Sequence, residues 1–287
     1  MHTESNHSPV RAVRPVTPYL GGKRNLARRI IAEIERIPHD IYAEPFVGGG
    51  GVFLRRAAAP RSEVVNDLNR DVATFFRVLQ RHYVAFMEMI KFQLTTRAEF
   101  ERLVATDPDT LTDLERSARF LYLQRTAFGG KVSGRNFGID PGRPARFDVT
   151  KLGTLLEDLH CRLARVVIEC LPYAEFIARY DRAETLFYLD PPYFGCEGDY
   201  GRHLFARADF ERLAALLRGL KGRFLMSIND TPEIRDTFAG FDLREVTTTY
   251  SVSGRGRPKA ASELLIFGGT CGHPPSQACS KSPQKGT

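Results

Sequence analysis

The chain has 287 residues, of which 43% are hydrophobic and 26% are charged. These proportions are typical of a globular protein and exclude a collagen-like, low-complexity or mostly disordered chain. No apolar run approaches the roughly 20 residues needed to cross a bilayer, and the polar start of the chain has no apolar core like that of a signal peptide. We therefore expect a cytoplasmic protein with no membrane partner.

The charge and the cysteine content indicate which kinds of partner and bound group to expect. The chain has 41 basic and 34 acidic residues and a formal net charge of +7, which suggests a polyanionic partner without identifying it. The 5 cysteines include no CxxC pair, which argues against a disulfide framework and against a cysteine-rich zinc site. We expect no bound metal.

The first part of the chain alternates helix and strand. Apolar residues recur at helical spacing over residues 23–37, and residues 41–43 predict a short strand. After four consecutive glycines, residues 52–59 return to a helical pattern, and residues 63–66 predict a second strand that ends in Asp67. A strand, a glycine loop, a helix and a strand ending in an acid are typical of the first half of a nucleotide-binding α/β domain.

A helical segment then interrupts this alternation. Residues 71–127 contain few strand signals, residues 129–144 have the composition of a long loop, and residues 151–163 predict an amphipathic helix. The remaining predicted elements are helices at 173–180 and 207–219 and strands at 166–168, 185–189, 224–228, 250–252 and 263–267. The pattern predicts an α/β fold with a helical insertion.

The glycine loop indicates a nucleotide-like ligand. Its backbone can approach a ligand closely, yet it fits neither the GxGxxG pattern of dinucleotide sites nor a P-loop. The loop has the pattern Glu44-x-Phe46-x-Gly48-x-Gly50. A carboxylate at this turn suits a ligand with a cationic end, such as S-adenosylmethionine, and Asp67 stands where an acid can accept both ribose hydroxyls. The alternative is a plain glycine turn with a surface aspartate.

The most informative stretch is Asp190-Pro191-Pro192-Tyr193, which follows the strand predicted over residues 185–189. Proline has no amide hydrogen and disfavours helix for the residue before it, so the two prolines stiffen this turn. The Asp190 carboxylate and a backbone carbonyl can accept both hydrogens of an exocyclic amine while the Tyr193 ring stacks on the base. Such positioning directs the nitrogen at an electrophilic methyl group without a covalent enzyme intermediate. The alternative is a structural turn with a core tyrosine.

Together, these motifs resemble the N6-adenine-specific DNA methyltransferases of the Dam-like, D12 class, which belong to the alpha group of amino-methyltransferases. Residues 18–23 (PYLGGK) resemble the family's N-terminal motif, residues 44–51 its cofactor loop, and residues 66–69 (NDLN) its ribose-binding strand end. The similarity covers about residues 15–267. It implies a site-specific enzyme that uses S-adenosylmethionine as methyl donor, needs no metal and acts on double-stranded DNA.

The resemblance also implies the architecture. We expect a class I S-adenosylmethionine-dependent methyltransferase fold, with a Rossmann-like sheet that has helices on both faces. The catalytic domain would be discontinuous, over residues 15–76 and 165–268, and residues 77–164 would form a helical target-recognition insertion. The termini, residues 1–14 and 269–287, lack an apolar pattern and are expected to be disordered.

Site residues follow from the same resemblance. The expected cofactor contacts are Tyr19, Lys23, Glu44, Phe46, Gly48, Gly50, Asp67 and Asp190. The turn Asp190, Pro191, Pro192 and Tyr193 would hold the target base and carry catalysis. Tyr19 departs from the family pattern, where tryptophan is frequent, but keeps an aromatic face. Phe194 and residues 227–230 fit a wall of the base pocket, with ordinary strand-end packing as the alternative.

An adenine inside a duplex must be flipped out before its N6 can react, and the insertion is where we expect the DNA to be read. Residues 125–151 contain six basic and two acidic residues, with Phe128, Phe137 and Phe147 between them. Such a loop can contact phosphates and base edges and wedge into the stack. The alternative is a solvated loop whose phenylalanines pack on the domain. The expected DNA contacts, which include a second basic loop, are Arg125, Lys131, Arg135, Asn136, Arg255, Arg257 and Lys259.

Two other functions stay open at this point. The chain could be an N4-cytosine methyltransferase, because cytosine also carries an exocyclic amine that must be held in the same way, although the turn of those enzymes usually begins with serine. A non-catalytic DNA-binding relic of the fold is the alternative from another class. We expect a monomer, and we favour an orphan or prophage enzyme over a restriction–modification enzyme because no cleavage domain is apparent. The recognition sequence does not follow from the residues.

Overall fold

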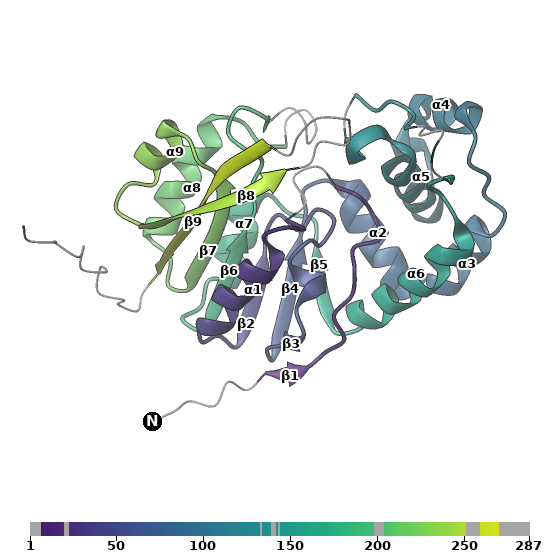
Figure 1. Cartoon of the computed structure of the whole chain (residues 1–287). Helices are drawn as coiled ribbons and strands as arrows, with labels where there is room; N and C mark the ends of the chain where they lie inside the picture. Colours follow the sequence, from purple (N-terminus) through teal and green to yellow (C-terminus); the bar gives the residue numbers. More distant parts are fainter. Residues whose placement is uncertain are drawn as a thin grey trace, which may run out of the picture.

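The computed structural model describes most of the chain. The described residues are 7–19, 23–132, 134–138, 142, 144–197, 204–250 and 259–269. Within them lies a seven-stranded sheet in the order β5-β4-β2-β6-β7-β9-β8 (Figure 1). The first five strands in this order are parallel, whereas β9 pairs antiparallel with β7 and with β8. The strands are β2 (Ile41–Glu44), β4 (Ser62–Asn66), β5 (Val166–Glu169), β6 (Thr185–Leu189), β7 (Arg223–Asn229), β8 (Asp242–Tyr250) and β9 (Lys259–Gly269).

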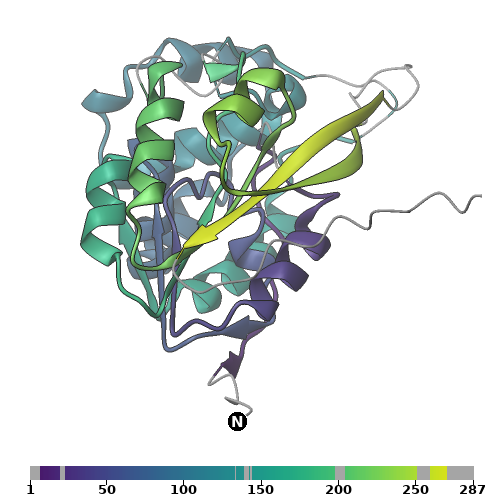
Figure 2. The ribbon, with the colours of Figure 1, turned by 90° about the vertical axis from the view of Figure 1, so that its left-hand side faces the viewer.

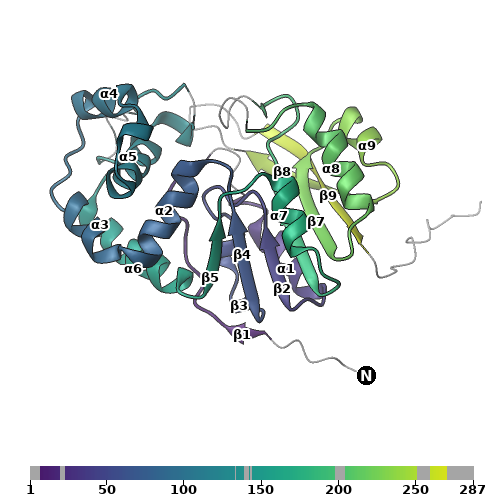
Figure 3. The ribbon, with the colours of Figure 1, turned by 180° about the vertical axis from the view of Figure 1, so that it is seen from behind.

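Helices cover both faces of the sheet because alternate residues of its strands point to opposite sides. On β2, Tyr42 joins the core under α1 (Ala27–Arg36), whereas Ala43 joins the core of the other face. Figure 1 shows α1 in front of the sheet, and Figure 3 shows the helices of the opposite face. These helices are α7 (Tyr173–Tyr180), α8 (Ala208–Arg218) and α9 (Pro232–Thr237). The expected α/β sheet with helices on both faces is confirmed.

The predicted insertion is helical and gathers beyond β5 at one side of the sheet (Figure 1). Its helices and the one before it are α2 (Arg70–Arg81), α3 (Tyr83–Ile90), α4 (Arg97–Ala105), α5 (Asp113–Thr126) and α6 (Val149–Leu163). Phe86, Phe120 and Leu156 belong to the same buried cluster as the α1 side of the sheet. The insertion therefore extends the core of the sheet rather than forming a separate one.

Two predictions, for the N-terminal residues and for residues 52–59, are wrong. Residues 7–14 are ordered in the structure: β1 (Ser8–Pro9) pairs with β3 (Ala58–Ala59), and Val13 is buried. Residues 52–59 do not form the predicted helix, because only Phe53–Arg55 form a single 3₁₀ turn before β3. The apolar side chains of both segments are buried against each other and the sheet, so tertiary packing overrides the local pattern. Residues 1–6 lie outside the described residues.

The C-terminal hairpin is longer than predicted. β8 begins at Asp242, and the two strands pair from Asp242–Phe267 to Tyr250–Lys259 (Figure 2). Most of β8 was not predicted, because this edge strand carries many polar residues and shows a weak apolar pattern. The connection that contains Arg255 and Arg257, and residues 270–287, lie outside the described residues. No helix in the described part of the chain is long and apolar enough to cross a bilayer.

Candidate active site

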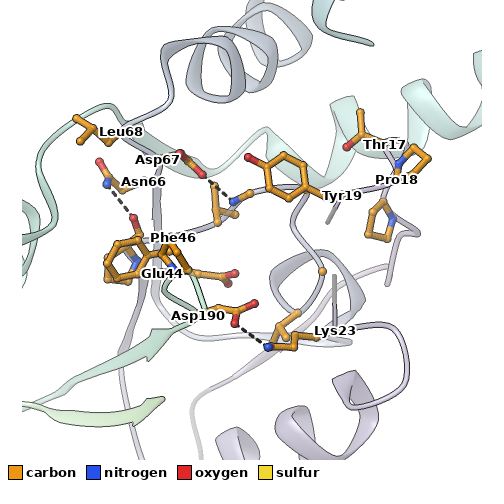
Figure 4. Close-up of a pocket in the computed structure, with 18 of the residues that line it drawn as sticks. Thr17, Pro18, Tyr19, Lys23, Glu44, Phe46, Asn66, Asp67, Leu68 and Asp190 are labelled. Atoms are coloured by element: carbon orange, nitrogen blue, oxygen red, sulfur yellow. Dashed lines mark hydrogen bonds and ion pairs between the residues drawn. The ribbon is translucent and has the colours of Figure 1, made fainter. Parts of the chain in front are cut away.

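A pocket of about 890 Å³ lies at the carboxyl ends of β2, β4 and β6 (Figure 4). Strand β2 has β4 on one side and β6 on the other, and such a reversal of strand order is where open α/β sheets bind ligands. Of the residues predicted for the cofactor and the base, the pocket is lined by Tyr19, Lys23, Glu44, Phe46, Gly48, Asp67, Asp190 and Pro192. The structure therefore brings together residues that are far apart in the sequence.

Asp67 fixes the shape of the glycine loop. Its Oδ2 accepts a hydrogen bond from the amide of Gly48 at 2.9 Å, and its Oδ1 accepts one from the amide of Asn69 at 2.9 Å. Burial raises the pKa of Asp67 to about 6, although both amide hydrogen bonds oppose the shift. A carboxylate oxygen has a second lone pair, so Asp67 can still accept a ligand hydroxyl in the pocket.

Two glycines of the loop have a left-handed backbone but different surroundings. Gly48 has φ 49°, and a Cβ there would lie 3.1 Å from the Tyr19 ring, so the aromatic side chain rests directly on the loop. Gly50 has φ 72°, but a Cβ there would meet Leu54 at 2.8 Å. Gly50 turns toward the core and does not line the pocket, where Gly49 and Gly51 are found instead. Gly50 therefore shapes the turn, contrary to the expectation of a direct cofactor contact.

Glu44 is a buried acid on the pocket wall. Only 2% of the residue is exposed, and its Oε2 accepts a hydrogen bond from the Tyr42 hydroxyl at 2.6 Å. Burial raises the pKa of Glu44 to about 8, the Tyr42 hydrogen bond opposes the shift, and the nearby Asp190 adds to it. A cationic ligand would favour the ionised form of this group.

The other end of the pocket is aromatic, and of its three rings only Phe46 was predicted as a site residue. The rings of Phe46, Tyr173 and Phe205 lie 5.7 to 5.8 Å apart, centroid to centroid. Asn66 holds the adjoining loops together, because its Nδ2 donates to the carbonyls of Pro45 and Leu171 at 2.9 and 3.0 Å. Tyr173 opens the predicted helix at 173–180, but nothing in its local pattern marked it as a pocket residue.

In the Asp-Pro-Pro-Tyr turn, Asp190 faces the pocket and is paired with Lys23. Asp190 Oδ1 lies 2.9 Å from Lys23 Nζ and accepts from the Ser227 hydroxyl at 3.3 Å (Figure 4). Burial raises the pKa of Asp190 to about 6, while Lys23 opposes the shift. Among the described residues, no hydrogen bond to Oδ2 occurs. This oxygen can therefore accept a hydrogen bond from a substrate amine.

Lys23 is turned toward the protein rather than the open pocket. Besides Asp190, its Nζ donates to the Tyr193 hydroxyl at 2.6 Å and lies 3.2 Å from Glu263 Oε2. The ammonium group therefore has two close acceptors, Asp190 Oδ1 and the Tyr193 hydroxyl, and an ion-pair contact with Glu263. Lys23 is one of the lining residues, but its charge is directed at the turn. Neither Pro191 nor Tyr193 is among the described lining residues.

The carboxyl end of β7 supports the same turn. Asn229 accepts from the amide of Phe194 at 2.9 Å and donates to the carbonyl of Phe194 at 3.1 Å. Ser227 also exchanges a hydrogen bond with the Tyr188 hydroxyl at 2.8 Å. Asn229 and Ser227, two of the residues that we expected at the wall of the base pocket, therefore hold the backbone and the acid of the turn.

The expected DNA contacts are not brought together in the same way. Arg125 donates to the carbonyls of Val16 and Arg146 at 2.8 and 3.0 Å, so it ties the N-terminal segment to the insertion. Arg135 donates to Gln124 Oε1 at 3.1 Å, and burial lowers its pKa to about 10. Lys131 and Asn136 are exposed. Arg255 and Arg257 lie outside the described residues, as does the side chain of Lys259.

The three phenylalanines of the insertion loop divide into two groups. Phe147 is buried, with its ring 5.1 Å from that of Tyr122, and the Phe137 ring lies 5.2 Å from that of Phe100. For these two the packing alternative is correct. Phe128 is 43% exposed, so it alone of the three presents a large part of its ring to a partner.

A glycine loop, a ribose-type acid and an Asp-Pro-Pro-Tyr turn thus meet at one pocket of a mostly parallel sheet, which defines an α/β amino-methyltransferase. The family model for D12 class N6 adenine-specific DNA methyltransferases matches residues 19–252. The chain belongs to this family and is an adenine-specific DNA methyltransferase. The resemblance drawn from the motifs is confirmed.

Several curated proteins are similar over most of the chain. The type II methyltransferase M.CviBI of Paramecium bursaria Chlorella virus NC1A is 23% identical, over 83% of this chain and 91% of that protein. M1.LlaDCHI of Lactococcus lactis subsp. cremoris is 26% identical, over 88% and 95%. A DNA adenine methylase of Vibrio cholerae is 26% identical, over 88% and 96%.

The similarity to solved structures is weaker. A precorrin 8w decarboxylase from Methanobacterium thermoautotrophicum is 14% identical, with a TM-score of 0.37 over 85% of this chain and 89% of that chain. These values support no conclusion about this protein.

Proposed function

We propose that the chain moves a methyl group from S-adenosylmethionine to the N6 amine of an adenine that has been flipped out of duplex DNA. The observation that carries the proposal is Asp190, whose Oδ1 is held by Lys23 while its Oδ2 faces the pocket without a hydrogen bond among the described residues. Methyltransferases of this family use S-adenosylmethionine as donor, and this pocket suits it.

The cofactor end of the pocket fits that donor in shape and charge. The aromatic group Phe46, Tyr173 and Phe205 offers faces to an adenine ring, and Asp67 offers carboxylate oxygens to ribose hydroxyls. Glu44 and Asp190 place two acids on the wall where a sulfonium and an ammonium group need compensating charge. The bound donor supplies the electrophilic methyl group.

The chain's own residues then orient the nucleophile. In this proposal, Asp190 Oδ2 accepts a hydrogen bond from one hydrogen of the adenine amine, and a backbone carbonyl of the turn accepts one from the other. The Tyr193 ring stacks on the base. Pro191 and Pro192 keep the turn from relaxing. Positioning and electrostatics account for the rate gain, and the proton can leave the amine after the methyl group has transferred.

We further propose that residues 77–164 form the target-recognition insertion, with Lys131, Asn136 and the exposed ring of Phe128 toward DNA. Arg255, Arg257 and Lys259 are proposed as a second set of phosphate contacts. Arg125 and Arg135 are left out of the direct contacts because both guanidinium groups bind protein acceptors. One copy of the chain suffices, since each strand of a site can be methylated in turn.

Methyl transfer from a sulfonium to an amine needs no Lewis acid. We therefore propose a metal-independent reaction. Two of the relatives are named type II methyltransferases, which favours a restriction–modification role over the orphan or prophage role preferred from the sequence. Protection of methylated DNA from cleavage in the source cells would test that role.

The test of the function is transfer of tritiated methyl from S-adenosylmethionine to unmethylated DNA, followed by nucleoside analysis. We expect the label in N6-methyladenine, at the same rate with and without EDTA. Label in N4-methylcytosine would overturn the base assignment, and a loss of activity in EDTA would overturn the metal-independent mechanism. Cofactor binding with no label on any DNA tested would overturn the proposed substrate.

A further inference from the structure

Glu263 is a buried acid beside the active site that the mechanism above does not use. It lies on β9, opposite Asn229 of β7, and only 1% of it is exposed. It does not line the pocket, so it is not placed to contact the donor. Burying a charged carboxylate is costly unless the group is paired and hydrogen-bonded, so its partners indicate what it stabilises.

Those partners belong to the methyl-transfer site. The Tyr193 hydroxyl donates to Glu263 Oε1 at 2.5 Å and accepts from Lys23 Nζ at 2.6 Å. The second oxygen, Oε2, lies 3.2 Å from Lys23 Nζ, an ion-pair contact without hydrogen-bond alignment. Lys23 in turn contacts Asp190 at 2.9 Å. One buried carboxylate thus connects both ends of the Asp-Pro-Pro-Tyr turn.

We propose that Glu263 is a positioning residue for methyl transfer, acting through the Tyr193 hydroxyl and the Lys23 ammonium. The inference rests on the proposed function, in which the Tyr193 ring stacks on the target base. A phenol that both donates and accepts a strong hydrogen bond is fixed in direction, and its ring is fixed with it. Glu263 therefore orders the stacking surface before the base arrives.

Glu263 also governs how Lys23 is shared. With two carboxylates around it, the ammonium group divides its interaction between Asp190 and Glu263. Without Glu263, Lys23 is free to shift onto Asp190, where it would compete with the adenine amine for the carboxylate. Both consequences change the geometry of the reacting groups, and small displacements of this kind cost catalytic rate rather than donor affinity.

The test is a double-mutant cycle of Glu263→Gln and Tyr193→Phe, read as single-turnover methyl transfer with donor and DNA saturating. Tyr193→Phe keeps the ring and removes only the hydroxyl. We expect each variant to react about tenfold more slowly, and the double variant also about tenfold more slowly, because both substitutions break the same network of Glu263, Tyr193 and Lys23. Donor Kd should change less than about threefold. Glu245→Gln, on neighbouring β8 and paired with Arg235 at the surface, is the matched control and should react at the wild-type rate.

A wild-type rate for Glu263→Gln, or a double variant about a hundredfold slower than wild type, would overturn the proposal. Glu263→Asp keeps the charge for folding but withdraws the carboxylate, so it should also lose about tenfold, and a wild-type rate there would equally contradict the proposal. If the wild-type protein methylates no DNA, the proposed function fails on its own. A crystal structure of Glu263→Gln then decides the question, because an unmoved Tyr193 ring contradicts the positioning role.

Discussion

The sequence predicted functional residues both at the strand ends and in the basic loop of the insertion. In the structure, only the residues at the strand ends converge on one site. At the pocket, side chains from segments far apart in the sequence converge, and Tyr19, Glu44, Asp67 and Asp190 all line one cavity. In the loop, Arg125, Arg135, Phe137 and Phe147 turn to protein partners. Parallel strands that end at one edge fix where their last residues lie, whereas a loop has no such constraint.

We expect the largest effect from breaking the contact that anchors the insertion to the sheet. Glu63 on β4 is buried between Arg56 at 2.9 Å and Arg162 of α6 at 2.7 Å. Removing it leaves two buried guanidinium groups without their acid. We expect Glu63→Ala to lower the free energy of unfolding by about 3–5 kcal/mol in urea denaturation. A loss below about 1 kcal/mol would mean that this contact does not anchor the insertion.

The acids of the pocket predict a pH dependence of donor binding. The pKa of Glu44 is about 8, and the pKa values of Asp67 and Asp190 are about 6, so they ionise progressively from pH 6 to pH 8. A cationic donor favours the ionised forms, and its affinity by calorimetry should rise by about tenfold over this range. Glu44→Gln should flatten the upper part of the rise. An affinity that falls with pH would contradict the assignment of these acids to the cationic end.

In the cofactor-free protein, the raised pKa of Glu44 makes stability fall as the pH rises. The pKa of Glu44 in the folded protein lies above its ordinary value of 4.5, so the folded state binds this proton more tightly than the unfolded state. This contribution to stability is fully present below pH 4.5 and is lost as the pH rises through about 8. In urea denaturation, Glu44→Gln should reduce the fall in stability over that range, and an unchanged slope would show that Glu44 is not buried as an acid.

Alanine substitutions at two glycines should distinguish the effect of backbone strain from the effect of a lost ligand contact. Gly48 in the cofactor loop and Gly129 in the insertion both have positive φ, of 49° and 68°. Substitution by alanine should destabilise each by about 1–2 kcal/mol. Only at Gly48 would the new Cβ press on the Tyr19 ring, at 3.1 Å, whereas nothing lies within 4 Å at Gly129. Gly48→Ala should therefore weaken donor binding, and Gly129→Ala should not; equal donor affinities would place the cofactor elsewhere.

The smallest expected effects are in the insertion loop. Lys131 is exposed and available to a phosphate, so Lys131→Ala should weaken DNA binding a few-fold on any sequence and reduce the salt-dependence slope by about 1. Arg125→Ala should instead lower stability, because it removes hydrogen bonds to two carbonyls. Fluorescence anisotropy at several salt concentrations, with thermal unfolding alongside, separates the two. An unchanged slope for Lys131→Ala would remove that residue from the interface.

Local pattern was enough for the parallel strands and for the acids at their ends, because both depend on short apolar runs followed by polar residues. It failed where partners come from distant segments. The segment 52–59 is apolar enough for a helix, yet it packs as a 3₁₀ turn and a strand against the N-terminal residues. Glu263 stood within a predicted strand, and nothing local indicated that it would reach Tyr193, 70 residues away.

The most direct test of the central claim is Asp190→Asn, measured both for donor affinity and for the single-turnover rate of methyl transfer to adenine. The amide keeps the shape of the side chain but removes the charge that holds the substrate amine. We expect a loss in rate of about a hundredfold or more, with donor Kd changed by less than about tenfold. Asp236→Asn, at an exposed aspartate, should behave as wild type. A variant that binds the donor poorly but transfers methyl at the wild-type rate when saturated would contradict the role of Asp190.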